Sequence, residues 1–343
     1  MGLAPQRQVT IFTCGANETH TNQPQSTVGL NGNNIFSVAS ALQAASPSVI
    51  PMVSIGDVDV GTAPGAARPA NVGSGEDIVG LFNSAASRAG GLLSRTGDAQ
   101  LYKAHFDAFT QLNRASDRST TKGAYTTASG AAGFLGTNLA DKLQIVQADL
   151  DRYGVNGNTR GNVADIARAF IVSVKAFKMG LTNSVVMPAM RDDPHGAFNG
   201  DVNTVPASMK LVFDAFMKDL QDNTDDNTMK SLADDTVITV HGDTTKDPTD
   251  RNNWPDGTPG NTNVVYVYSA GHLKSGWHGG VMRNGTARGF DAAAKDAPYN
   301  SNETAKLATA SIAYAIAKRD ERAIATFANG IGISGIFGRP KDI

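Results

Sequence analysis

A chain of 343 residues can bury a large core, either as one large α/β domain or as two smaller ones. Its formal net charge of -2 gives no reason to expect a nucleic-acid-binding surface, and its single cysteine, Cys14, excludes an internal disulfide. No apolar run is long enough to cross a bilayer, and the first residues do not form a signal peptide. The charged content of 18% is typical of a folded exported protein, so we expect a periplasmic, cell-surface or extracellular protein whose signal has been removed.

Five apolar runs have the length and composition of buried β-strands. In chain order they are Val9–Thr13, Val49–Ile55, Val185–Met190, Thr236–Val240 and Val264–Tyr268. Strands covered on both faces are apolar throughout, so we expect an α/β fold with one mostly parallel sheet sandwiched by helices. A glycine-bracketed segment beyond the last run predicts a hairpin over residues 276–281.

Helical patterns fill the space between these runs. The block between the second and third strands predicts helices beginning at Ser74, at Leu101 and at Ala131, and a last, most regular helix with apolar residues from Val163 to Phe177. This block is long for a crossover, so we expect residues 74–160 to form a helical cap or insertion within a single α/β domain of residues 1–343. Further helices are predicted around residues 209–220 and 305–317.

Polar residues with metal-ligand chemistry follow three of the predicted strands. Glu18 and His20 follow the first, Asp193 and His195 the third, and Asp243 the fourth. In open α/β sheets the loops at the carboxyl ends of the strands line the ligand crevice, so we expect these side chains to converge. A carboxylate–imidazole–carboxylate set is suited to a divalent metal ion. The other interpretation of Glu18 and His20 is a solvated polar loop.

The order of these motifs allows a comparison with a known family. Asp193-Pro194-His195 follows one strand, Gly242 to Pro248 follows the next, and the glycine-rich segment Ala270 to Gly280 comes later. This succession resembles the exported bacterial sulfatase-like proteins of the alkaline phosphatase superfamily, whose members carry D-T-H, then G-E-F-G-R-T-P, then a glycine-rich hairpin. The resemblance covers roughly Gly161 to Val281. It implies an alkaline-phosphatase-like fold and a metal site with Asp193, His195 and Asp243 as ligands.

The chain departs from the pattern of that family at several places. The glutamate of the family is Asp243 here and its arginine is Lys246, while Asn261-Thr262-Asn263 stands where an Asp-His pair is expected. Asparagine is a poor replacement for an imidazole ligand of zinc. The usual nucleophile after the first strand is not recognisable, so Thr19 and Thr21 are the remaining hydroxyl candidates.

Two functions from different classes follow. The first is a metal-dependent hydrolase of phosphate or sulfate esters, with one zinc, calcium or magnesium ion and with Thr19, Thr21 or water as the nucleophile. The second is a pseudoenzyme that keeps the fold for binding or for structural assembly, with a cell-surface partner or as a homo-oligomer. The retained Asp193-x-His195 favours the first. The missing histidine and nucleophile favour the second, which is the function we expect.

Overall fold

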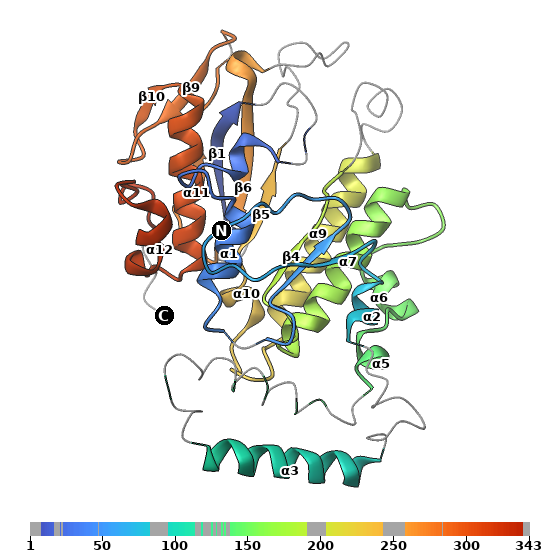
Figure 1. Cartoon of the computed structure of the whole chain (residues 1–343). Helices are drawn as coiled ribbons and strands as arrows, with labels where there is room; N and C mark the ends of the chain where they lie inside the picture. Colours follow the sequence, from blue (N-terminus) through green and yellow to red (C-terminus); the bar gives the residue numbers. More distant parts are fainter. Residues whose placement is uncertain are drawn as a thin grey trace.

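The protein has a mixed α/β fold (Figure 1). The structure is a computed structural model, and it describes residues 8–16, 21, 23–46, 48–82, 95–113, 118, 125, 128, 132, 134, 138–190, 204–242, 258–282 and 284–338. The strands of the described part are β1 (Val9–Ala16), β2 (Met52–Ile55), β3 (Ala70–Val72), β4 (Ser184–Val186), β5 (Ile238–His241), β6 (Thr262–Tyr268), β7 (Gly276–His278), β8 (Gly280–Val281), β9 (Ala287–Phe290) and β10 (Asp296–Pro298). The helices are α1 (Ile35–Leu42), α2 (Ile78–Leu81), α3 (Thr96–Leu112), α5 (Leu139–Leu143), α6 (Gln147–Arg152), α7 (Gly161–Lys178), α9 (Thr204–Asp222), α10 (Leu232–Asp235), α11 (Ser301–Ile316) and α12 (Glu321–Ala328), with 3-10 turns η2 (Gln25–Thr27) and η4 (Pro259–Asn261).

The described strands form three separate sheets. One has the order β5-β6-β1-β7, in which β6 runs antiparallel to both of its neighbours and β7 runs parallel to β1. The second, β3-β2-β4, is parallel throughout. The third, β10-β9-β8, is antiparallel.

All five predicted strands are present, as β1, β2, β4, β5 and β6, but their predicted arrangement in one largely parallel sheet is wrong. Only β2 and β4 belong to the parallel sheet, while β1, β5 and β6 lie in the mostly antiparallel one. An apolar run indicates burial on both faces, and burial is compatible with either strand direction. The coarser prediction of an α/β fold that includes a parallel sheet is confirmed.

The predicted hairpin over residues 276–281 is also wrong. β7 pairs with β1, whereas β8 pairs with β9 in another sheet. Gly279 lies between them with a φ of 78°, and a Cβ at this position would lie 2.6 Å from the Arg288 carbonyl oxygen. The segment therefore carries the chain from one sheet to the next, and glycine permits the left-handed turn.

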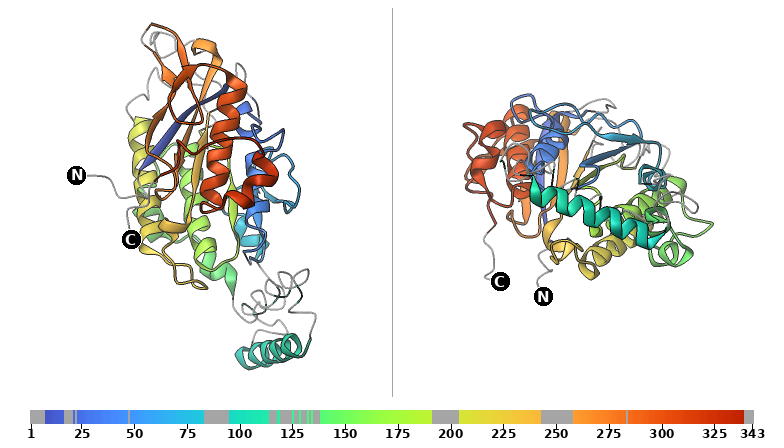
Figure 2. Two further views of the ribbon diagram at one scale, coloured as in Figure 1. Left: turned by 90° about the vertical axis from the view of Figure 1, so that its left-hand side faces the viewer. Right: turned by 60° about the horizontal axis from the view of Figure 1, so that its bottom comes forward.

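Helices cover the four-stranded sheet and flank the parallel one. α11 packs against β1 and α1, and its buried face includes Ala308 and Ile312, which join Phe12 of β1 in one core. α7 packs against α9, where the rings of Phe170 and Phe216 stack with their centroids 4.0 Å apart. Figures 1 and 2 show α11 on one side of the four-stranded sheet and the α7–α9 pair on the other side of β5. The predicted regular helix that faces the core is therefore confirmed as α7.

The predicted helical block contains several short helices. α2 and α5 contact each other, and both α5 and α6 contact α7, while α3 lies apart from the other helices in Figures 1 and 2. The role of residues 74–160 as a cap stays a prediction. Within the described ranges, none of the helices combines the length and apolar character needed to cross a membrane.

Candidate functional site

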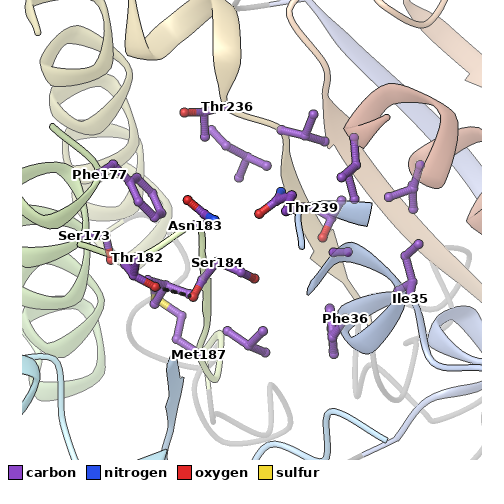
Figure 3. Close-up of a pocket in the computed structure, with 18 of the residues that line it drawn as sticks. Ile35, Phe36, Ser173, Phe177, Thr182, Asn183, Ser184, Met187, Thr236 and Thr239 are labelled. Atoms are coloured by element: carbon purple, nitrogen blue, oxygen red, sulfur yellow. Dashed lines mark hydrogen bonds between the residues drawn. The ribbon is translucent and has the colours of Figure 1, made fainter. Parts of the chain in front are cut away.

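A cavity of about 1450 Å³ lies between the parallel sheet and the four-stranded sheet (Figure 3). β4 and β5 border it, and α1, α7 and α9 also contribute to its wall. Its volume exceeds the ~300–1,000 Å³ that is usual for small-molecule pockets. The cavity can therefore hold a ligand larger than a typical metabolite.

β4 and β5 each present a strand edge to the cavity. Every residue of Thr182–Met190 and of Asp235–Gly242 contributes to the lining. Successive side chains of a strand point to opposite faces, so an unbroken run of lining residues shows that an edge meets the cavity. Among the described strands, β4 pairs with β2 alone and β5 with β6 alone, which leaves both of these edges without a partner strand.

Most of the lining is apolar or polar without charge. Figure 3 shows side chains from both walls around one space, namely Ile35, Phe36, Ser173, Phe177, Thr182, Asn183, Ser184, Met187, Thr236 and Thr239. The charged members of the described lining are Asp57, Asp225, Lys230, Asp235, Lys318 and Asp320. Asp235 forms an ion pair with Lys318, and Asp225 accepts hydrogen bonds from the N–H groups of Asn227 and Thr228. These carboxylates are therefore engaged by partners of the same chain.

His241, at the end of β5, is the most unusual polar residue of the wall. Its Nδ1 lies 3.4 Å from the Ser26 hydroxyl, and its ring packs edge-on against Phe36 with the centroids 5.2 Å apart. Burial lowers the pKa of His241 from 6.5 to about 4, so the ring is neutral at physiological pH. The contact between Ser26 and His241 is therefore one between a hydroxyl and a neutral imidazole.

Two buried polar atoms of this wall have no hydrogen-bond partner within the protein. Among the described side chains they are the Nε2 of His241 and the Oε1 of Gln43, and the Ser48 hydroxyl is the third such atom. A buried polar atom without a partner costs about 1–3 kcal/mol. Both atoms are enclosed by protein, so this cost is part of how α1 packs against the end of β5.

The predicted site residues fall almost entirely outside the described part of the chain. This holds for Glu18, Thr19, His20, Asp193, His195 and Asp243, and also for most of the polar loop that follows Asp243. Thr21 is described. It is exposed at the cavity, where its hydroxyl accepts a hydrogen bond from the Gln23 N–H at 3.2 Å.

The described neighbours of these residues do lie around one space. Thr21, Met190 and Gly242 all line the cavity, and they stand one to three positions from His20, Asp193 and Asp243 in the chain. The predicted reason for convergence was wrong, because β4 and β5 are not neighbours in one sheet. Met190 and Gly242 share one space instead because the edges of two sheets face the same cavity.

The described residues contain no group of three His, Cys, Asp or Glu side chains that could hold a metal ion. The described imidazole of the wall, His241, does not stand within such a group. A divalent ion would therefore depend on Glu18, His20, Asp193, His195 and Asp243, whose geometry lies outside the described residues.

Sequence reasoning did not single out the roles of Gln43, Phe36 and His241 in this wall. The signal for His241 was its position at the end of an apolar strand, directly before Gly242 and Asp243. The signal for Gln43 was weaker, because a polar residue after a short helix is ordinary.

Comparison with protein-family models, with curated proteins and with solved structures gives no match to this chain.

Proposed function

We propose that this chain is an exported binding protein, related in architecture to the alkaline phosphatase superfamily, that has lost full catalysis. The observation that carries the proposal is the cavity between the two sheets, whose described wall is mainly uncharged and includes the edges of β4 and β5. Burial of apolar surface supplies ~25 cal/mol per Å², and a few polar groups then fix the orientation of a ligand. A neutral His241 ring can donate one hydrogen bond and accept another through its two nitrogens.

Filling the cavity is expected to abolish binding without unfolding the protein. Ala39 lies on α1 and contributes to the wall, so Ala39→Trp places an indole in the space that a ligand needs. With 8-anilinonaphthalene-1-sulfonate as the probe, we expect the affinity of the folded protein to fall at least tenfold in a fluorescence titration, or by ~1.4 kcal/mol.

A matched variant, Ala104→Trp, adds the same side chain to an exposed position of α3 and should leave dye binding unchanged. Circular dichroism and thermal unfolding establish that both variants are folded, since partly unfolded states also bind this dye. Equal dye affinity in wild type and folded Ala39→Trp would show that the cavity is not the binding site.

The second candidate is the metal-dependent ester hydrolase. It is supported by the described residues Thr21, Met190 and Gly242, which line one cavity and stand close in the chain to the predicted ligands. In that mechanism Asp193, His195 and Asp243 hold the ion, which polarises the ester oxygen, and a hydroxyl or water attacks.

The hydrolase hypothesis makes a prediction about metal content. Asp193→Asn should lower the zinc, calcium or magnesium bound to the purified protein, and it should remove the stabilisation of ~2.7 kcal/mol expected at a metal concentration of one hundred Kd. Elemental analysis and thermal unfolding with each ion measure the two effects, with the exposed Asp98→Asn of α3 as the control. Absence of bound metal in wild type, together with no turnover of phosphomonoesters, phosphodiesters or sulfate esters, would leave only the binding function.

A further inference from the structure

The edge of β5 that pairs with no described strand presents backbone hydrogen-bonding groups to the cavity. The Gly242 N–H donates to the Val264 carbonyl oxygen at 3.0 Å, which places residue 242 among those that face β6. In an antiparallel ladder such residues alternate along the strand, so Val240 and Ile238 also face β6. Thr239 and His241 therefore direct their N–H and C=O groups to the opposite edge, which borders the cavity.

The free edge of β4 follows the same logic on the other wall. The Asn183 N–H donates to the Pro51 carbonyl oxygen at 3.3 Å, so the odd-numbered residues of this strand face β2. Ser184 and Val186 consequently face the cavity edge. On this edge the Thr182 hydroxyl donates to the Ser184 carbonyl oxygen at 3.2 Å.

Apolar side chains lie on both faces of the sheet beside the β5 edge, and they determine which side chains a bound strand can carry. Ile238 packs with the α7–α9 core, whereas His241 contacts Phe36 of α1. A strand added beside β5 would send alternate side chains toward these two apolar layers, so both of its faces would be buried. Burying a charge there without a partner is costly, which selects an uncharged segment.

We propose that the cavity binds an extended, uncharged, apolar peptide segment of a partner protein, which adds as a strand to the β5 edge. This inference rests on the proposed binding function and names the class of its ligand. The main-chain groups of Thr239 and His241 supply affinity, and the apolar layers on either side supply selectivity. At ~3.3 Å per residue, four to six residues of peptide span the edge.

The probe is a capped hexapeptide of alternating valine and threonine, whose binding is measured by isothermal titration calorimetry. Its control has the same sequence with alternate amide nitrogens methylated, which removes the N–H donors of one edge and keeps the side chains. We expect the methylated peptide to bind at least tenfold more weakly. Equal binding of the two peptides, or binding of neither, overturns the inference.

A protein variant tests the same contact from the other side. The N–H of Thr239 faces away from β6, so Thr239→Pro removes a donor of the free edge and keeps the ladder with β6. We expect it to weaken peptide binding at least tenfold, while Thr239→Val, which keeps the backbone N–H, stays within about threefold of wild type. Full peptide affinity in a folded Thr239→Pro overturns the inference.

The outcomes separate this inference from the proposed function. If the dye binds the cavity and Ala39→Trp blocks it, but the peptide does not bind, the binding function stands and the peptide class is wrong. If neither ligand binds, both are wrong. If the peptide binds and sedimentation also shows self-association that the peptide disperses, a second copy of the chain is the partner that supplies the strand.

Discussion

Gly29→Ala is expected to destabilise the protein by about 3 kcal/mol or more, at the upper end of the cost of overpacking a core. A Cβ at Gly29 would lie 2.2 Å from the Ala305 carbonyl oxygen and 2.5 Å from the Thr309 hydroxyl. Both residues belong to the buried face of α11, which packs against β1 and α1. Relief of the clash would require the whole helix to shift within a filled core.

Urea denaturation provides the measurement, with the midpoint compared at an unchanged dependence on denaturant. Gly161→Ala is the control, because Gly161 is the exposed first residue of α7 and a Cβ there meets no atom within 4 Å. We expect this second variant to be as stable as wild type or more stable by up to ~1 kcal/mol, since alanine favours the helix. Equal urea midpoints for Gly29→Ala and wild type would show that the backbone at Gly29 does not lie close to α11.

Strand positions were predictable because each of β1, β2, β4, β5 and β6 overlaps an apolar run with the composition of a buried strand. Strand partners were not predictable from the same signal. β6 pairs antiparallel with β1 through contacts between residues more than 240 positions apart, as in the pairing of Val9 with Tyr268. Local composition carries no information on such distant pairing, and for this reason the single parallel sheet was wrong.

Helix limits show what local sequence signals can decide. The helix predicted from Ala131 to Tyr153 is divided in its described part into α5 and α6. The carboxylate of Asp149 accepts a hydrogen bond from the Val146 N–H at 3.1 Å, which begins a new helix in mid-segment. α12 was not predicted, although Asp320 is a good N-cap and Ile324, Phe327 and Ala328 follow with helical spacing.

The convergence of Glu18, His20, Asp193, His195 and Asp243 stays a prediction, because these residues lie outside the described part of the chain. Of the described residues near them, Thr21, Met190 and Gly242 line one cavity. The unpaired atoms of Gln43 and His241 depend on how α1 packs against the end of β5. Such packing follows from the tertiary arrangement, which no motif in the chain encodes.

A group of buried charges beside α7 leads to the second large effect. The Asp149 carboxylate is mostly buried and lies 2.6 Å from the Lys175 ammonium group. Arg152 joins Asp149 to Asp219, whose carboxylate also accepts a hydrogen bond from the Tyr153 hydroxyl at 2.9 Å. Removal of Lys175 leaves the mostly buried Asp149 carboxylate with the half-exposed Arg152 as its remaining ion-pair partner among the described residues, so its charge is compensated less well.

Lys175→Met is therefore expected to destabilise the protein by about 2–3 kcal/mol at pH 7, somewhat below the 3–5 kcal/mol typical of a fully buried pair because Lys175 is partly exposed. Lys210→Met is the control. Lys210 pairs with Asp214 one helical turn away on α9, and both side chains are exposed, so its loss should cost less than about 0.5 kcal/mol.

The effect of Lys175→Met should also depend on pH. Burial raises the pKa of Asp149, but the hydrogen bonds from Lys175 and from the Val146 N–H outweigh it, so the pKa lies below the ordinary 3.8. A lowered carboxylate pKa stabilises the folded state above the unfolded pKa, and this stabilisation is lost as pH falls through the folded pKa. Urea titrations of wild type and variant should therefore differ most at neutral pH and converge below about pH 3.8. A difference in stability that stayed constant from pH 7 to pH 3 would show that Lys175 acts through packing of its aliphatic chain and not through the charge of Asp149.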